Sequence, residues 1–231
     1  ESIDTTISHD AIELDIVYED EYLLIINKPA GMPVMVTKSH PHQTLSNALC
    51  YYYTEHHIMS KIHLVNRLDK DTSGLMAVAK NRYIKYLLSE NLEHKIEREY
   101  YCIVKGIPEL AHQVIQLPIQ KENQDSMIRV VHPSGQNAIT EYTVMKSFKD
   151  MSLLKVILQT GRTHQIRVHL SHLGHPIIGD KLYHDSDNST EMMLFSHRIK
   201  LIHPITKKEI EFNFDIPESF KKILNTKGQN S

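Results

Sequence analysis

Cysteine is scarce in this sequence, and its scarcity excludes two kinds of architecture. The 231 residues include two cysteines, Cys50 and Cys102, which lie far apart in different predicted elements. Two such cysteines form neither a disulfide framework nor the ligand spacing of a zinc site. We therefore expect both to be buried as small hydrophobic residues, in a protein of the reducing cytoplasm.

Long hydrophobic runs are missing as well. No apolar stretch approaches the ~20 residues that a transmembrane helix needs. The chain does not open on the basic and then apolar segment of a secretory signal, and it has no internal repeat or low-complexity linker. Apolar residues make up 41% of the chain and charged residues 23%, which is typical of a globular protein.

Lys and Arg are absent from positions 1–21, which hold eight Asp and Glu residues. The rest of the chain carries all 26 basic residues and the other 20 of the 28 acidic residues, a net charge of +6. The net charge of −2 for the whole chain argues weakly against a nucleic-acid partner. An acidic leader before a moderately basic body is nevertheless compatible with RNA binding.

Hydrophobic patterning predicts strand pairs that alternate with single helices, which favours an α+β fold with mostly antiparallel sheet. Strands are expected at residues 16–18, 23–27, 75–79, 100–104, 138–145 and 152–160, with short strands and turns between 107 and 140. Thr44 and Asn81 are expected to cap two helices, the second with Tyr83, Ile84, Leu87 and Leu88 facing inward. Of the tyrosines at 51–53, we expect one or two in the core, with base stacking as the alternative.

A dense polar cluster stands just before the predicted strand at 75–79. Residues 67–74 read Arg-Leu-Asp-Lys-Asp-Thr-Ser-Gly, and the last three are typical of a turn. Reactive groups are often held in this way on a rigid support. Asp69 and Asp71 are both candidate functional carboxylates. The alternative for each is an Asp that only shapes the turn.

A second informative stretch covers residues 160–176. Thr163 is a candidate N-cap, and Ile166, Leu170 and Leu173 recur at helical spacing. Gly174 and Pro176 would end this helix. Arg167 would then lie in the second turn, where its guanidinium could reach a carboxylate outside the helix. Asp69 is the candidate partner, and a solvated surface charge is the alternative.

Four histidines, at 164, 169, 172 and 175, occupy the same stretch and raise the possibility of a metal site. No Cys, Asp or Glu lies between residues 161 and 179 to complete one. Histidines at the surface or facing RNA are therefore favoured over metal ligands.

Several segments together resemble the RluA family of RNA pseudouridine synthases, which isomerise uridine to pseudouridine within RNA. They keep the family's order and spacing and span most of residues 16–200. The segments are residues 26–34 (Ile-Asn-Lys-Pro-Ala-Gly-Met-Pro-Val), 67–74, 98–106 (Arg-x-Tyr-x-Cys-x-Val-x-Gly), 161–169 (Gly-Arg-Thr-His-Gln-Ile-Arg-Val-His) and 174–180 (Gly-His-Pro-Ile-Ile-Gly-Asp).

The resemblance implies three catalytic residues. Asp69 would be the catalytic aspartate, and Arg167 would pair with it. Tyr100 would stack on the target base and later help to deprotonate carbon 5. Four further residues are expected to contact RNA, among them Arg67, which would enter the RNA stack in place of the flipped base; the set is Lys28, Arg67, Arg162 and His164.

The chemistry explains why this set is sufficient. The base must be detached from the ribose, turned and rejoined through carbon, which calls for a carboxylate acting as nucleophile or base. Burial raises the pKa of a carboxyl group, and a neighbouring arginine opposes that rise. Enzymes that act on a base inside RNA flip it out of the stack. The family uses no metal and no cofactor.

The resemblance also implies the architecture and the setting. We expect a mixed, mostly antiparallel sheet in two halves with flanking helices and a central cleft. Residues 16–231 would form the catalytic domain, and residues 1–15 a lead-in that could end a linker from an N-terminal RNA-binding domain. The expected partner is structured RNA, with rRNA favoured over tRNA, and the expected state is a cytoplasmic monomer.

The sequence departs from the family pattern at three positions, and two other functions compete. Asn66, Arg98 and Cys102 stand where the family usually has His, Lys and Ala. One rival function is a non-catalytic RNA-binding module that kept the fold. The other is a metal-dependent hydrolase that uses the histidines of residues 164–175.

Overall fold

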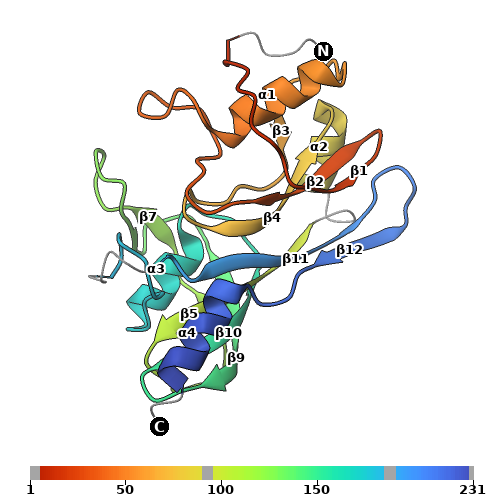
Figure 1. Cartoon of the computed structure of the whole chain (residues 1–231). Coiled ribbons are helices and arrows are strands. Elements are labelled where there is room, and N and C mark those ends of the chain that lie inside the picture. The colour runs from red at the N-terminus through yellow and green to blue at the C-terminus, as the bar shows by residue number, and fades with distance from the viewer. Residues whose placement is uncertain (1–5, 90–95, 185–190, 229–231) are drawn as a thin grey trace. The chain divides into compact units, whose positions relative to one another are not determined.

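The computed structural model describes residues 6–89, 96–184 and 191–228 as an α+β protein (Figure 1). Two compact units share the chain. Unit 1 holds residues 1–96 and 199–212, and unit 2 holds residues 97–198 and 213–231. Strand β11 (Leu194–Ile202) contributes to both, because its residues from Ile199 onward belong to unit 1. No helix within the described residues is long and apolar enough to cross a membrane.

The sheet of unit 1 follows the order β1-β2-β4-β11. β1 (Ile16–Glu19) and β2 (Leu23–Lys28) form an antiparallel pair, and β2 pairs in turn with β4 (Ser73–Ala79). The short β3 (His63–Leu64) pairs with β4, and β12 (Glu209–Asn213) pairs with β11. Nearly every residue of β2 and β4 is buried, which explains why both read as continuous apolar runs.

The two helices of unit 1 begin at the predicted caps. In α1 (Leu45–Glu55) the Thr44 hydroxyl accepts from the Asn47 backbone N–H at 3.2 Å, while the Asn47 side chain accepts from the Thr44 N–H at 3.0 Å. Before α2 (Arg82–Ser89), Asn81 Oδ1 accepts from the Ile84 N–H at 2.9 Å. Both sets of bonds satisfy first-turn donors that otherwise have no partner in the helix.

Of the two predictions about the tyrosines of these helices, one is confirmed and one is wrong. Tyr53 is fully buried, whereas Tyr51 and Tyr52 are half-buried at the rim of the core. Tyr83, predicted to face inward, is 64% exposed. The buried side of α2 is centred on Ile84, Leu87 and Leu88, and Tyr83 lies about 100° around the helix from Ile84.

Unit 2 is built on an antiparallel sheet in the order β11-β5-β10-β9-β6. A separate hairpin and two helices complete it, and Cys102 lies fully buried in β5. The strands are β5 (Glu97–Lys105), β6 (His112–Gln116), β9 (Ile139–Ser147) and β10 (Met151–Leu158); the hairpin is β7 (Ile119–Lys121) with β8 (Arg129–Val131); the helices are α3 (Gln165–His172) and α4 (Glu218–Gly228).

The start of α3 differs from its prediction. The N-cap is His164, with φ of 57°, and its side chain makes no capping bond; Thr163 is therefore not the cap. The side-chain oxygen of Gln165 reaches back instead and accepts from the Arg162 N–H at 2.9 Å. The other end is as predicted, since Gly174 has φ of +82°, the left-handed conformation that glycine adopts without strain.

The acidic leader is attached to unit 1 wherever the structure describes it. Residues 6–15 have no helix or strand, yet Asn47 Nδ2 donates to the Ser8 carbonyl at 2.9 Å and the Gln43 N–H donates to Asp10 Oδ2 at 2.7 Å. Glu1 and Asp4 lie outside the described residues.

Candidate active site

The loop that carries Asp69 is fastened to strand β4. The Val65 N–H donates to the Ala77 carbonyl at 3.0 Å, and the Ala77 N–H donates to Asn66 Oδ1 at 2.8 Å. The Asn66 side chain thereby extends the β3–β4 ladder by one hydrogen bond. Further along, the Thr72 N–H donates to the Asp69 carbonyl at 3.2 Å and closes a turn.

Exposure distinguishes the charged residues of this loop. Asp69 is half-buried, whereas Arg67 and Asp71 are exposed, and Leu68 anchors the segment with 7% exposure. A half-buried carboxylate on a clamped loop is a better candidate for a functional group than an exposed neighbour. This supports Asp69 over Asp71, and the exposed Arg67 lies two residues before Asp69 in the sequence.

Lys28 does not face solvent, so the structure contradicts the prediction that it contacts RNA. Its side chain is buried at 1% exposure, and Nζ donates to the carbonyls of Pro29, Met32 and Lys70 at 2.7, 3.0 and 2.9 Å. An ammonium group has three protons, so these bonds use its whole donor capacity. Lys28 instead ties the end of β2 to the Asp69 loop.

The charge of Lys28 is sensitive to its burial. Desolvation lowers its pKa to about 8, and the negative charges of Asp71 and Asp69 partly oppose the fall. The positive end of this side chain therefore contributes to the electrostatics of the Asp69 loop near neutral pH without leaving the protein interior.

In unit 2, Arg167 forms a buried, bidentate ion pair with Asp180. Nε lies 2.7 Å from Asp180 Oδ2 and Nη2 lies 2.8 Å from Asp180 Oδ1. Arg167 is 8% exposed and Asp180 1%. The alternative of a solvated surface charge is therefore wrong, and the guanidinium does reach a carboxylate outside its own helix. Its pairing with Asp69, which belongs to unit 1, stays a prediction.

Sequence reasoning missed Asp180 as a partner, although a signal was present. Asp180 is the first acidic residue after Asp150, and it closes the 174–180 segment that resembles the family. Its Oδ1 also accepts from the backbone N–H groups of Leu182 and Tyr183, at 3.0 and 3.3 Å. These additional bonds fix the carboxylate that orients Arg167.

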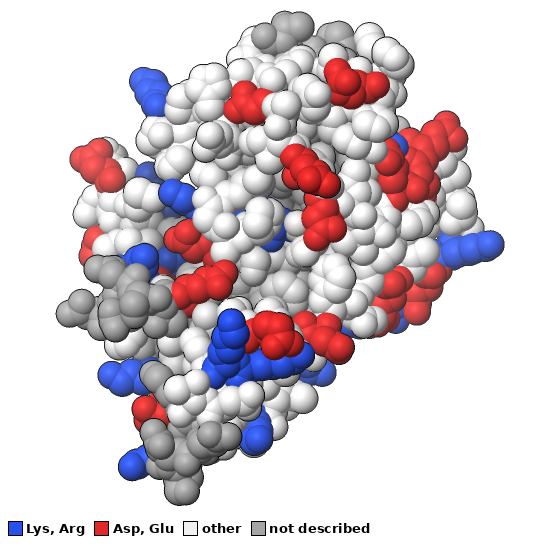
Figure 2. Space-filling model, viewed as in Figure 1, with Lys and Arg blue, Asp and Glu red and all other residues white. Residues whose placement is uncertain are grey.

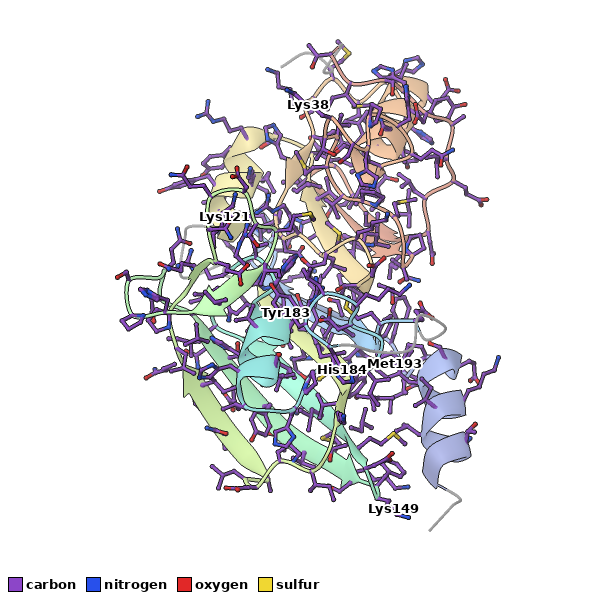
Figure 3. The ribbon with its side chains drawn as sticks, turned by 90° about the vertical axis from the view of Figure 1, so that its left-hand side faces the viewer. Lys38, Lys121, Lys149, Tyr183, His184 and Met193 are labelled. Atoms are coloured by element: carbon purple, nitrogen blue, oxygen red, sulfur yellow. The ribbon has the colours of Figure 1, made fainter. Side chains whose placement is uncertain are left out.

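Tyr183 is a second residue that sequence reasoning missed. The Arg167 guanidinium carbon lies 5.0 Å from the centre of its ring, a cation–π contact. The Tyr183 hydroxyl accepts from the Arg129 N–H at 2.8 Å and lies 2.8 Å from His164 Nδ1. Figure 3 shows Tyr183 beside α3. This one side chain therefore connects Arg167, His164 and the β7–β8 hairpin.

Tyr100 and Arg162 complete the predicted set in unit 2. Tyr100 lies in β5 opposite Val156 of β10 and is 3% exposed. Arg162 is exposed just before α3, and its Nε donates to the Asn137 carbonyl at 2.9 Å. The roles of both residues stay predictions.

The histidines of residues 164–175 are not equivalent. His169 is fully buried, so the prediction of a surface or RNA-facing position is wrong for it. Its Nε2 donates to the Leu117 carbonyl at 2.9 Å, and Nδ1 accepts from the Thr140 hydroxyl at 2.8 Å. Within the described residues, no group of three or more His, Cys, Asp or Glu side chains could hold a metal ion.

The family model described as RNA pseudouridylate synthase matches residues 22–172 of this chain. The chain belongs to that family. The matched range includes Asp69, Tyr100 and Arg167. The resemblance to the RluA-type pseudouridine synthases is thereby confirmed, and the chain is an isomerase that acts on uridine in RNA.

Curated relatives and a solved structure agree with this assignment. An uncharacterised RNA pseudouridine synthase of Bacillus subtilis strain 168 is 35% identical over 232 residues, covering 100% of this chain and 81% of that protein. The ribosomal large subunit pseudouridine synthase D of Escherichia coli K12 is 36% identical over 229 residues, covering 92% and 70%. Human RNA pseudouridylate synthase domain containing 4 has a TM-score of 0.73 at 25% identity, with 91% of each chain covered.

Asn66 stands where the pseudouridine synthases of this type usually have His, and its removal tests the attachment of the loop. Asn66→Ala leaves the buried Ala77 N–H without its 2.8 Å acceptor, so the free energy of unfolding should fall by about 1–3 kcal/mol. Urea denaturation measures the loss. Asn66→His, whose ring nitrogen can accept the same bond, should recover most of it. Equal stability of Asn66→Ala and wild type would show that the Asn66–Ala77 hydrogen bond does not stabilise the attachment of the loop.

His169 predicts a dependence of stability on acid pH. Burial lowers its pKa, and the hydrogen bond to the Leu117 carbonyl partly opposes this. The unfolded chain therefore binds the proton first as the pH falls below about 6.5, and the folded state loses stability. The stability gap between wild type and His169→Gln should narrow from pH 7.5 to pH 5.5 in urea denaturation. A gap that stays constant would contradict this.

Proposed function

We propose that this enzyme converts specific uridines of large-subunit ribosomal RNA to pseudouridine, with Asp69 as the catalytic carboxylate. The observation that carries the residue assignment is the half-buried Asp69 on a loop held by Asn66 and Lys28. The choice of RNA is supported by relatives named ribosomal large subunit pseudouridine synthase D.

The proposed reaction is an internal transfer that balances without a cofactor. The bond from ribose C1′ to uracil N1 breaks, the uracil turns, and C1′ bonds to C5. The proton of C5 is lost and N1 gains one, so there is no net oxidation or reduction. Asp69 acts as nucleophile or base, and Tyr100 stacks on the uracil and helps to remove the C5 proton.

The remaining side chains hold charge and position. Arg67 fills the place of the flipped uridine in the RNA stack, for which its exposure and its nearness to Asp69 in the sequence are suited. Arg167 opposes the cost of placing a carboxylate against a stacked base. Arg162 and His164 contact the RNA backbone. We assign the reaction to residues 16–231 as one catalytic domain, acting as a monomer in the cytoplasm.

Transcripts labelled with tritium at carbon 5 of uracil test the activity and the substrate together, because rejoining through that carbon releases the label to water. Large-subunit rRNA, small-subunit rRNA and tRNA transcripts are incubated separately with the enzyme. We expect release from large-subunit rRNA that stops at a small whole number per molecule. Release from tRNA alone would refute the proposed substrate, and no release from any RNA would refute the activity.

A further inference from the structure

A polar pocket of about 320 Å³ opens in unit 2 between the β7–β8 hairpin and the loop that leads into α3. Its volume is at the lower end of small-ligand sites, which span roughly 300–1,000 Å³. Only one of its lining residues is apolar. The lining consists of Ile119, Gln120, Lys121, Arg129, Ser134, Gly135, Gln136, Arg162 and Thr163.

Backbone contacts set the shape of this pocket. Ile119 and Gln136 exchange two backbone hydrogen bonds of 2.9 Å, which hold the turn of residues 132–136 against β7. A Cβ atom at Gly135 would lie 2.6 Å from the carbonyl carbon of Ile119, closer than real contacts allow. Glycine is therefore required there, and one wall of the pocket is made by the main chain.

Three cations line the pocket, and each is held by neutral oxygen atoms. Lys121 Nζ donates to the Gln124 carbonyl at 2.9 Å, and Arg162 Nε donates to the Asn137 carbonyl at 2.9 Å. Arg129 Nη1 lies 3.2 Å from the Met127 carbonyl and 3.3 Å from that of Ile128. In the described part of the chain, none of the three cations forms an ion pair with a carboxylate. Their charges are positioned without being neutralised.

Acidic groups are near the pocket but not in it. Among the residues that the structure describes, no Asp or Glu lines the pocket. Glu122 belongs to the same hairpin, and its carboxylate accepts from the Ser126 hydroxyl at 3.0 Å. Ser134, Thr163, Gln120 and Gln136 add neutral donors to the wall. A site with three positive charges, several hydrogen-bond donors and no acid selects an anion.

The positive charge around the pocket contrasts with the charge of the chain as a whole. The chain carries a net charge of −2, and on the face drawn in Figure 2 Lys and Arg atoms are interspersed with Asp and Glu atoms. With a net negative charge, attraction of RNA depends on local clusters of positive charge rather than on the charge of the whole chain. The positive end of the α3 dipole points toward the loop that supplies Arg162 and Thr163, which adds to the attraction.

We propose that this pocket binds one phosphodiester group of the substrate RNA through Lys121, Arg129 and Arg162. The proposal rests on the RNA substrate of the proposed function and adds a binding site for one phosphate of the RNA backbone. Arg129 also links this phosphate site to Arg167, since the Arg129 N–H donates to the Tyr183 hydroxyl and the Tyr183 ring lies against the Arg167 guanidinium. Binding of the phosphate would fix the position of the RNA strand relative to the residues around Arg167.

Salt dependence of RNA binding is the direct test, because each phosphate contact releases counterions. Binding of a labelled large-subunit rRNA fragment is measured at several salt concentrations for wild type, Lys121→Gln and Arg129→Gln. Each variant should bind roughly tenfold more weakly at low salt. The slope of log Kd against log salt should fall by about 0.7–0.9 per cation removed. In tritium release, KM should rise while kcat stays close to the wild-type value.

Lys149→Gln is the matched control. Lys149 is an exposed lysine of the same unit and lies at its opposite end from Lys121 (Figure 3), so the substitution changes the net charge equally. It should leave Kd, the salt slope and KM unchanged. The Arg129 guanidinium contacts the carbonyls of Ser126, Met127 and Ile128, so Arg129→Gln could lose local structure. The Lys121 side chain donates only to the Gln124 carbonyl, so Lys121→Gln keeps the test valid if Arg129→Gln misfolds.

Three results would overturn the proposal. The first is an unchanged salt slope in Lys121→Gln, and the second is an equal change in Lys149→Gln. The third is submillimolar binding of inorganic phosphate or uridine monophosphate to wild type, but not to Lys121→Gln, that leaves the RNA affinity unchanged, which would make the pocket a site for a free anion. Because these are binding measurements, they give an answer even if no RNA releases tritium, and that failure would bear on the proposed function alone.

Discussion

Replacing Asp69 with Asn is expected to lower tritium release by at least about 10³-fold, because an amide can act neither as the nucleophile nor as the base of the reaction. Asn has the shape of Asp, and the backbone bond from Thr72 to the Asp69 carbonyl does not involve the carboxylate. The RNA dissociation constant should therefore stay within about twofold of the wild-type value. Single-turnover release and equilibrium RNA binding measure the two effects separately.

Asp71→Asn is the control for this substitution. The two carboxylates are two residues apart in the same loop, but Asp71 is exposed. The Asp71 variant should keep most of the wild-type rate. If Asp69→Asn is fully active, or if Asp71→Asn folds normally and is inactive, the assignment of Asp69 as the catalytic carboxylate is wrong.

Replacing Arg167 with Ala is expected to lower the free energy of unfolding by about 3–5 kcal/mol and to abolish most activity. The cost arises because the Asp180 side chain, which is fully buried, would keep its charge without its partner. The contact with the Tyr183 ring would be lost as well. Urea denaturation of Arg167→Ala measures the loss, and Arg167→Ala with Asp180→Ala should recover part of it, because removing both partners leaves no unpaired charge. If the free energy of unfolding of Arg167→Ala lies within 1 kcal/mol of the wild-type value, the buried ion pair does not stabilise the protein as predicted.

A double-mutant cycle tests the predicted pairing of Arg167 with Asp69 apart from its pairing with Asp180. The Asp180 contact is present in both Asp69 backgrounds, so its contribution cancels in the cycle. Stability is measured for Arg167→Ala, Asp69→Asn and the double variant. A coupling free energy above about 0.5 kcal/mol would support the pairing. Strict additivity would place Asp180 as the main partner of Arg167.

Local patterns in the sequence were enough for most of the regular structure. The caps Thr44 and Asn81 act over three residues, so the bonds they make can be read from the sequence alone. The runs at 23–27 and 75–79 became β2 and β4, because an interior strand buries both of its faces and so accommodates a short run of consecutive apolar residues. Gly174 ended α3 for an equally local reason. In each case the signal and the structure lie within one turn or one strand.

The errors occur where distant segments meet. Thr163 has the chemistry of an N-cap, but Gln165 forms the bond in its place while also donating to Thr140 of β9. His169 is buried because Leu117 and Thr140, far away in the sequence, supply its two partners. Lys28 is buried because its third carbonyl comes from Lys70, 42 residues later. Such partners are decided by tertiary packing, and the pattern around one residue does not contain them.

The candidate site divides in the same way. Motif order predicted the family correctly, and the roles that it implies for Asp69, Tyr100 and Arg167 stay predictions. Asp180 and Tyr183, which fix the orientation of Arg167, are visible only when α3 is packed against the segment that follows it. A sequence motif can therefore suggest candidate site residues more readily than the residues that hold them in place.

The division of β11 between the two units has a consequence for how the chain is made. A ribosome releases residues in order, and β4 is complete long before Ile199 to Ile202, which join the sheet of unit 1 beside it, have been synthesised. Until then the edge of β4 opposite β2 is covered only by β3 and Asn66, and its remaining N–H and C=O groups lie in a mostly apolar strand, a hazard for association with other nascent chains. Unit 1 therefore cannot finish folding during synthesis of its own first segment, and it waits for nearly the whole polypeptide to emerge.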